Sequence, residues 1–298
     1  MSIDPQKQDL KIGVVGAGAM GRGIAQVSAT GGMSVYIFDA ADGAAAAARD
    51  FIASMIERSV EKGRMDKAEG TNAISLLNVA ENMEGLSDCD VVVEAIVENL
   101  DIKQKVFRQL EEIVRPDTII ASNTSSIRIS SIASACTHRE RIAGLHFFNP
   151  VPLMKLVEVI NGTDTSKEVT SALEIIGKRM GRVPVVVKDA PGFLVNLGGR
   201  SYTTEALRIV SEGVATPFQV DAIMREACGF RMGPFELIDL TGIDVNFPVS
   251  QIIYNGYFQD KRLSTYPLHE SMMEAGRLGR KTKAGFYKYE DDGTILRP

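Results

Sequence analysis

At 298 residues the chain is long enough to bury a substantial core in one large or two smaller domains. Its 45% hydrophobic and 24% charged residues are ordinary for a soluble globular protein, and the net charge of −5 gives no reason to expect nucleic acid as a partner. No apolar stretch approaches the length of a membrane helix and the N-terminus has no targeting pattern, so we expect a cytoplasmic protein without membrane association.

A glycine-rich turn between a strand and a helix opens the patterned part of the chain. The apolar run Ile12–Val15 predicts a buried strand, and the sequence GAGAMG follows it directly. Helical spacing then continues from Ile24 to Ala29, and Val35–Phe38 predicts a second strand that ends at Asp39. This order of strand, glycine turn, helix, strand and acid is typical of a dinucleotide-binding unit.

The residue types at this turn suit the parts of a dinucleotide. Gly16 permits the tight turn, Gly18 lets the backbone approach a pyrophosphate, and Gly21 lets the helix pack closely on the strand. The free N–H groups at the start of the helix face the phosphates, and Met20, within the same turn, is also an expected cofactor contact. Asp39 suits a ribose 2′-hydroxyl and would repel a 2′-phosphate, which favours NAD over NADP as the cofactor.

The alanine-rich segment that follows Asp42-Gly43 and runs to about Lys62 predicts a helix with basic residues near its end. Arg58, Lys62 and Arg64 there have two interpretations. They are cations placed favourably at a helix C-terminus, or they form a binding site for the phosphates of a large anionic substrate.

Strands alternate with helices over the following hundred or so residues. Glycines at 63 and 70 break the helical pattern, and the polar stretch that follows predicts one short strand near residues 77–80. Further strands are predicted at 91–95, 118–121, 142–147, 154–160 and 183–187, and helices at 101–114, 129–136 and 166–180. This alternation predicts an α/β fold, a Rossmann-like, doubly wound and mostly parallel sheet. The last strands, close in sequence, allow an antiparallel edge, and Pro184 marks an edge strand or a strand start.

The pattern changes at Pro191-Gly192, a plausible domain boundary. Helical periodicity continues from there to about Gly276, with candidate helices at 196–211, at 217–228 and after Pro234. We therefore predict an NAD-binding domain over residues 1–189 and an all-helical C-terminal domain over residues 190–298. The second domain is expected to close a substrate cleft or to form an oligomer contact.

Three polar clusters fall at the carboxyl ends of predicted strands, where ligands sit in an open parallel sheet. They are Glu98-Asn99, Asn123 to Ser126, and His146 with Asn149. His146 is the one histidine at such a strand end. His138 lies in a polar connection and is expected at the surface, and His269 has no carboxylate in a telling position apart from its neighbour Glu270.

Hydride transfer from an alcohol to NAD needs a proton acceptor, and a neutral imidazole serves at neutral pH. Glu158 lies on the next predicted strand and can return beside His146 if the turn after Asn149 reverses the chain. A carboxylate there would orient the ring and stabilise the imidazolium. The alternative is a strand carboxylate that faces solvent, and the spacing alone does not choose between the two.

The cysteines Cys89, Cys136 and Cys228 are widely spaced and form no CxxC pair. We interpret them as free buried thiols in a reducing compartment, and no metal site is expected.

The sequence resembles the NAD-dependent (3S)-3-hydroxyacyl-CoA dehydrogenases, including those of the 3-hydroxybutyryl-CoA type, over about residues 10 to 290. The segments that carry the resemblance are GVVGAGAMGRGIAQ, VVVEAIVENLDIK, ASNTSS, GLHFFNPVPLMKLVEV, PGFLVN, GPFELIDLTG and GRKTKAGFYKY. The resemblance implies oxidation of a 3-hydroxyacyl-CoA to the 3-ketoacyl-CoA and the reverse reduction. A short-chain substrate such as 3-hydroxybutyryl-CoA is expected.

The resemblance also implies roles for individual residues. His146 would be the general base, Glu158 its partner, Ser125 a hydrogen-bond partner of the substrate oxygen, and Asn196 a residue of the second domain that holds the reacting group. The expected cofactor contacts are Gly16, Gly18, Met20, Gly21, Asp39, Glu98, Lys103, Asn123, Ser125, Asn149 and Lys281. Ser54 and Lys62 are the nearest matches to the coenzyme A contacts, and a homodimer through the C-terminal helices is implied. Lys283 stands where the family usually has glycine, which makes the role of Lys281 less secure.

The sequence is compatible with two other functions. One is a related hydroxyacid or sugar-acid dehydrogenase that does not use coenzyme A. The other is a nucleotide-binding module without catalysis, against which the set of His146, Glu158, Ser125 and Asn196 argues, because a sensor needs no proton acceptor.

Overall fold

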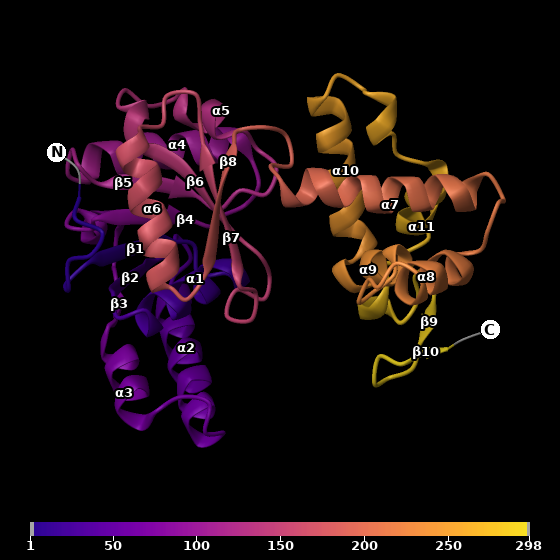
Figure 1. The fold of residues 1–298 in the computed structure, drawn as a ribbon. Helices are drawn as coiled ribbons and strands as arrows, with labels where there is room; N and C mark the ends of the chain where they lie inside the picture. The colour runs from indigo at the N-terminus through magenta and orange to yellow at the C-terminus, as the bar shows by residue number, and fades with distance from the viewer. Residues whose placement is uncertain (1–2, 297–298) are drawn as a thin grey trace. The chain divides into compact units, whose positions relative to one another are not determined.

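The structure is a computed structural model that describes residues 3–296. The chain divides into two units, Met1–Ala190 and Pro191–Pro298, which Figure 1 shows as a ribbon coloured along the chain. This division lies one residue from the boundary that Pro191-Gly192 suggests in the sequence. Each unit is described by itself below.

Unit 1 is built on one eight-stranded sheet in the order β3-β2-β1-β4-β5-β6-β7-β8. The strands from β3 to β6 pair in parallel, whereas β6 and β7 pair antiparallel and β8 runs parallel to β7. Pro184 lies on the outermost strand, β8, as its missing N–H leads one to expect. The predicted mostly parallel sheet with an antiparallel edge is confirmed. The bounds are β1 Lys11–Val15, β2 Ser34–Phe38, β3 Leu77–Val79, β4 Val91–Glu94, β5 Ile119–Ser122, β6 Ile142–Phe147, β7 Leu156–Asn161 and β8 Val183–Lys188.

Helices cover the sheet (Figure 1), and alternate strand residues point into an apolar layer beneath some of them. On β1, for example, Ile12 and Val14 join a core to which Ile24 of α1, Ile52 of α2 and Leu173 of α6 also belong. The helix bounds are α1 Ala19–Thr30, α2 Ala44–Glu61, α3 Lys67–Ser75, α4 Leu100–Ile113, α5 Ile129–Ala133 and α6 Lys167–Arg179, with short 3₁₀ turns at Met83–Leu86 and Arg139–Arg141.

Helix α3 was not expected, because Gly63 and Gly70 suggested a break in helical structure. The Asp66 side chain caps this helix by accepting a hydrogen bond from the Ala68 N–H at 2.7 Å. A Cβ atom at Gly70 would lie 2.6 Å from Val60 Cγ2, so the glycine permits α3 to pack closely on α2. The predicted short strand near residues 77–80 is confirmed by β3, whereas the helix before it was missed because Gly70 serves helix packing rather than chain reversal.

Unit 2 is helical, with one small addition. Its helices are α7 Val195–Ser211, α8 Pro217–Glu226, α9 Pro234–Thr241, α10 Ile243–Gly256 and α11 Pro267–Glu274, with 3₁₀ turns at Lys261–Leu263 and Arg280–Thr282. The addition is a two-stranded antiparallel pair, β9 (Lys288–Tyr289) with β10 (Ile295–Leu296), which the expectation of an all-helical domain did not include.

Two buried aspartates fasten the C-terminal segment of unit 2 to its helices. Asp239 of α9 accepts hydrogen bonds from the N–H groups of Phe286 and Tyr287, both at 3.0 Å, and from the Tyr289 hydroxyl at 2.8 Å. Asp221 of α8 accepts one from the Tyr287 hydroxyl at 2.8 Å. Burial raises the pKa of both carboxyl groups, although these donors oppose the rise.

The structure also bears on the cysteines and on membrane insertion. Cys89 and Cys136 are buried free thiols as predicted, but Cys228 is exposed, because it follows the last turn of α8.

Over residues 3–296, no helix combines the length and the apolar character that a membrane crossing demands.

Candidate functional site

The glycine turn between β1 and α1 is shaped by contacts that exclude side chains. Gly16 has a φ of +108°, and a Cβ atom there would lie 2.5 Å from the carbonyl oxygen of Ala95. A Cβ atom at Gly21 would lie 1.8 Å from the Gly16 carbonyl oxygen. A Cβ atom at Gly18 would meet no heavy atom within 4 Å, so the chain itself leaves this position open.

This open position fits a dinucleotide. Gly18 is the N-cap of α1 and supplies no side chain to the free N–H groups there, which remain available to phosphate oxygens. Asp39, at the end of β2, accepts hydrogen bonds from the Ala17 N–H at 2.7 Å and from the Ala41 N–H at 2.9 Å. The carboxylate is thereby fixed beside the glycine turn. Met20 is partly buried and packs against the apolar core.

His146 and Glu158 form a buried pair on neighbouring antiparallel strands. They are direct partners in the register of β6 and β7, and His146 Nδ1 lies 2.7 Å from Glu158 Oε2. The exposed fraction is 3% for His146 and 0% for Glu158. The chain therefore does reverse after Asn149, and the alternative of a solvent-facing Glu158 is excluded. Since an ionised carboxylate only accepts hydrogen bonds, the tautomer that fits an ionised Glu158 carries its proton on Nδ1 and leaves Nε2 as an acceptor.

Ser125 lies on the other side of the imidazole. Its Oγ, in the loop after β5, is 3.1 Å from His146 Nε2, so the ring lies between Ser125 on one side and Glu158 of β7 on the other. The ring of Phe148 packs against His146 with the two centroids 4.6 Å apart. The arrangement presents an acceptor nitrogen and a hydroxyl to whatever binds at this edge, which is what abstraction of a hydroxyl proton needs.

Glu98 holds the loop that carries Ser125. Its Oε1 accepts hydrogen bonds from the Thr124 hydroxyl at 2.6 Å, from the Ser125 and Ser126 N–H groups at 3.1 Å each, and from the Ser126 hydroxyl at 2.8 Å. Burial raises the pKa of Glu98, but the charge of Lys103 and the hydrogen bonds from Thr124 and Ser126 outweigh it, so the pKa lies below its ordinary value.

Lys103, a predicted cofactor contact, is buried in an ion pair. Its Nζ lies 2.6 Å from Glu94 Oε1 and 3.4 Å from Glu98 Oε2, and the side chain is only 1% exposed. Glu94 also accepts a hydrogen bond from the Ser122 hydroxyl at 2.7 Å. Glu94 was not among the predicted residues, although a carboxylate within the apolar run 91–95 is a signal that could have found it.

The remaining predicted residues of unit 1 lie in two places. Asn123 is 8% exposed, and its side-chain oxygen accepts a hydrogen bond from the Phe147 N–H at 2.9 Å, which ties the loop before Ser125 to the end of β6. Asn149 is exposed just beyond that strand. Ser54 and Lys62 are exposed on α2, where the Ser54 hydroxyl donates to the carbonyl oxygen of Phe51 at 2.8 Å.

Two predicted residues belong to unit 2. Asn196 lies in the first turn of α7, and its carbonyl oxygen accepts a hydrogen bond from Arg200 Nε at 3.3 Å. Lys281 Nζ lies 2.5 Å from the Asp244 carboxylate. The structure describes both residues within unit 2 alone, so their contributions to cofactor and substrate stay predictions.

The other two histidines lie away from the pair. His138 is exposed at 59% of its side chain, as predicted. His269 is 1% exposed, and its burial, together with the charge of Arg200, lowers its pKa to about 4.

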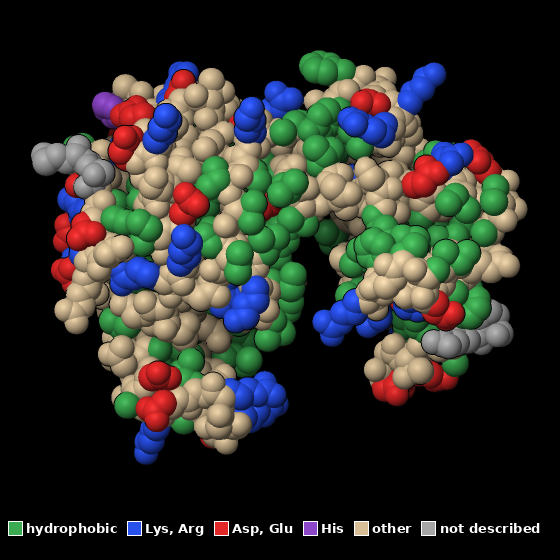
Figure 2. All heavy atoms as spheres, viewed as in Figure 1, with side chains coloured by type: hydrophobic (Ala, Val, Ile, Leu, Met, Phe, Trp, Pro, Cys, Tyr) green, Lys and Arg blue, Asp and Glu red, His purple; other side chains and the backbone are tan. Residues whose placement is uncertain are grey.

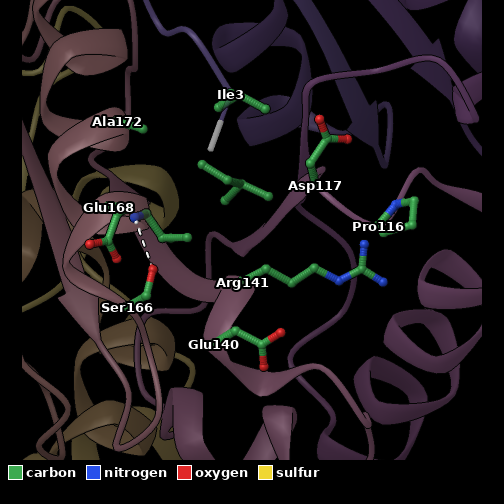
Figure 3. A pocket seen from close by; sticks show the side chains of 10 residues that line it. Ile3, Pro116, Asp117, Glu140, Arg141, Ser166, Glu168 and Ala172 are labelled. Carbon is green, nitrogen blue, oxygen red and sulfur yellow. Dashed lines mark hydrogen bonds between the residues drawn. The ribbon is translucent and has the colours of Figure 1, made fainter. Parts of the chain in front are cut away.

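A cavity of about 350 Å³ lies at the opposite edge of the sheet (Figure 3). It is lined by Ile119 at the start of β5, by Arg141 just before β6 and by Ser166 at the start of α6. Ser125 and His146 lie instead toward the carboxyl ends of β5 and β6, so this cavity is separate from the site that they form.

Comparisons with known proteins match both units of the chain. Residues 11–190 match the family described as "3-hydroxyacyl-CoA dehydrogenase, NAD binding domain", and residues 192–289 match "3-hydroxyacyl-CoA dehydrogenase, C-terminal domain". The chain is 40% identical over 280 residues to a probable 3-hydroxybutyryl-CoA dehydrogenase from Deinococcus radiodurans, which covers 94% of this chain and 100% of that protein.

Two further relatives extend the comparison. The crystal structure of (S)-3-hydroxybutyryl-CoA dehydrogenase from Ralstonia eutropha superposes with a TM-score of 0.90 at 38% identity, covering 94% of this chain and 99% of that one. The 3-hydroxyadipyl-CoA dehydrogenase of Escherichia coli is 39% identical over 278 residues, 93% of this chain, but the chain spans only 58% of that protein's length.

Proposed function

Since this chain belongs to the 3-hydroxyacyl-CoA dehydrogenase family, we propose that it oxidises (3S)-3-hydroxyacyl-CoA to 3-ketoacyl-CoA with NAD and catalyses the reverse reduction. The observation that carries the proposal is the contact of His146, near the carboxyl end of β6, with Glu158 of β7 on one side and with Ser125, just after β5, on the other. It lies at the sheet edge that also bears the glycine turn, because β1, β4, β5 and β6 run parallel. Short-chain substrates such as 3-hydroxybutyryl-CoA are the expected class.

His146 acts as the general base in this proposal. Nε2 of the neutral ring takes the proton of the substrate's 3-hydroxyl group while the C3–H bond gives up its hydride. When bound, NAD supplies the hydride acceptor. The Glu158 carboxylate, 2.7 Å from Nδ1, stabilises the imidazolium that results. In the reverse direction the protonated ring returns the proton to the 3-keto oxygen.

Ser125 orients the substrate oxygen, and Glu98 fixes the loop on which that serine lies. The hydroxyl of Ser125 lies near His146 Nε2, so the substrate's 3-oxygen can contact both groups. Asn196 is proposed as a second contact to the reacting group. Asp39 would bind the adenosine ribose, which is consistent with its place beside the glycine turn.

We also propose that the chain forms a homodimer through the helices of unit 2. This unit carries large apolar side chains that a single chain leaves exposed, among them Val214, Phe218, Ile223, Phe230, Leu240 and Val245. Sedimentation analysis should give twice the mass of one chain. A mass of one chain at micromolar concentration would contradict the dimer.

A substrate scan tests the proposed activity. Oxidation of NADH is followed with acetoacetyl-CoA, longer 3-ketoacyl-CoA esters and free acetoacetate, and each is repeated with NADPH. We expect turnover with NADH and a 3-ketoacyl-CoA, and little with NADPH because of Asp39. Turnover of free acids without coenzyme A would favour a related hydroxyacid dehydrogenase. Binding of NADH without oxidation by any substrate would favour a non-catalytic nucleotide-binding module.

A further inference from the structure

Arg200 on α7 is a buried cation without a counter-ion. It is 7% exposed, and no carboxylate within residues 3–296 forms an ion pair with it. Burial lowers its pKa to about 10, with no nearby carboxylate to oppose the shift. In the same unit, Arg225 is paired with Glu236. Because the desolvation of an unpaired charge is costly, buried cations normally have an anionic partner, and at Arg200 a ligand can supply it.

Neutral groups hold the Arg200 guanidinium in one orientation. Nη1 donates to the carbonyl oxygen of Asn246 at 3.1 Å, to the side-chain oxygen of Asn246 at 3.0 Å and to the Ser250 hydroxyl, all on α10. Nε donates to the carbonyl oxygen of Asn196 at 3.3 Å. Nη2 has no hydrogen-bond partner within residues 3–296 and retains contact with solvent. It therefore presents two N–H donors that are already oriented, as the binding of a carboxylate requires.

The face of α7 that carries Arg200 also carries Asn196. The two residues are four positions apart, so their side chains leave the same side of the helix one turn apart. Gly199 shares this face, and a Cβ atom there would meet no heavy atom within 4 Å. Glycine within a helix costs stability, and no neighbouring atom of the chain requires it at this position. The open surface at Gly199 leaves room for a ligand that extends from Asn196 to Arg200.

We propose that Arg200 binds a carboxylate at the far end of the acyl chain, so that the preferred substrate is the coenzyme A ester of a dicarboxylic 3-hydroxy acid. This inference rests on the proposed function, in which Asn196 contacts the reacting group. In a six-carbon chain the terminal carboxylate carbon lies three carbon–carbon bonds from C3, about 4 Å when extended. One helical turn advances about 5.4 Å. The two lengths are similar, so Asn196 can contact the 3-oxygen while Arg200 contacts the carboxylate.

The test compares two substrates that differ in one end group. The acyl chains of 3-ketoadipyl-CoA and 3-ketohexanoyl-CoA have the same length, and they end in a carboxylate and a methyl group respectively. With NADH we expect kcat/KM to be about 10–100-fold higher for 3-ketoadipyl-CoA, the effect of one charge-assisted contact. Arg200→Met removes the charge from a similar volume and should abolish this preference. Arg200→Lys should keep part of it, because the charge remains but the planar fork is lost.

Arg208→Ala is the matched control. Arg208 lies on the same helix, but it is exposed and paired with Glu205 and Glu212. Figure 2 shows acidic and basic side chains together over the C-terminal part of α7. Removal of Arg208 should leave the ratio of the two kcat/KM values unchanged. Thermal unfolding checks that each variant is folded.

Gly199→Leu tests the same site without removing any hydrogen bond of Arg200. A leucine side chain would fill the open surface between Asn196 and Arg200. It should therefore lower kcat/KM for both six-carbon substrates about tenfold relative to acetoacetyl-CoA, whose acyl chain is too short to reach Arg200. This variant and the preference of the wild type decide the question even if Arg200→Met does not fold.

Three results would overturn the inference. They are equal kcat/KM values of the wild type for the two six-carbon substrates, a folded Arg200→Met variant that retains the preference for 3-ketoadipyl-CoA, and a Gly199→Leu variant that treats six-carbon and four-carbon chains as the wild type does. These results are distinct from a failure of the proposed function, in which the wild-type chain itself oxidises NADH with none of the three 3-ketoacyl-CoA substrates.

Discussion

The two units of this chain use buried carboxylates for different purposes. In unit 1, the buried Glu158 contacts the ring of His146. Glu98, a partly exposed carboxylate in the loop between β4 and α4, holds the loop that carries Ser125. In unit 2, Asp221 and Asp239 accept hydrogen bonds from backbone N–H groups and tyrosine hydroxyls, and so replace the strand pairing that the unit largely lacks. A buried carboxylate is a candidate for catalysis only where the side chain that it contacts can itself reach a substrate.

The largest effect should come from separating the catalytic pair. Glu158→Gln should lower kcat by about 10²–10³-fold, because the imidazolium loses the carboxylate that stabilises it. The double variant with His146→Gln should lose no more than His146→Gln alone, since the two residues act as a unit. Steady-state rates with acetoacetyl-CoA and NADH measure this. Independent, multiplying losses would show that the pair is not a functional unit.

A carboxylate of unit 2 should matter for stability instead. Asp239→Ala leaves the N–H groups of Phe286 and Tyr287 and the Tyr289 hydroxyl without their acceptor. We expect a loss of about 3 kcal/mol or more in the free energy of unfolding. Denaturant unfolding measures it, with Asp292→Ala as the control, because Asp292 is an exposed carboxylate that accepts from the Thr294 N–H. Equal stability of the two variants would contradict the anchoring role.

Acid should weaken unit 2 through His269. The pKa of this histidine is lowered to about 4 by burial and by Arg200, so between about pH 6.5 and 4 the unfolded chain binds a proton that the folded chain does not. Stability should therefore fall as the pH falls through this window, by up to about 3 kcal/mol. His269→Leu should flatten the dependence, whereas His138→Leu, at an exposed position, should not. A pH dependence that survives in His269→Leu would refute this assignment.

Glu98→Gln should have the smallest effect of the set. The amide oxygen can still accept some of the four hydrogen bonds, but the charge that faces Lys103 is lost. A modest displacement of Ser125 should lower kcat about tenfold, the equivalent of about 1.4 kcal/mol. Glu112→Gln, at an exposed position on α4, is the control. A kcat equal to that of the control would show that the loop keeps its place without Glu98.

Much of unit 1 could be predicted because its signals are local. Apolar runs mark the strands, glycine spacing marks the turn, and polar residues directly after strands mark the edge where Ser125 and His146 meet. The meeting of His146 with Glu158 required the reversal after Asn149, which the spacing allowed without deciding. Helix α3 was not predicted, because Gly70 is explained by its close packing against Val60 on α2, which the local sequence does not reveal.

Unit 2 was less predictable for a physical reason. Asp221, Asp239 and His269 look like ordinary surface residues in the sequence, because their donors or their burial come from segments distant in the chain. Lys103 shows the same problem within unit 1, since only the folded chain reveals that its ammonium group is buried against Glu94.

The central claim is that His146 is the proton acceptor, and the kinetics of His146→Gln test it most directly. Single-turnover oxidation of NADH with saturating acetoacetyl-CoA should slow by about 10²–10⁴-fold, while the dissociation constant for NADH and the melting temperature stay close to those of the wild type. A variant that binds NADH normally and turns over at the wild-type rate would contradict the account.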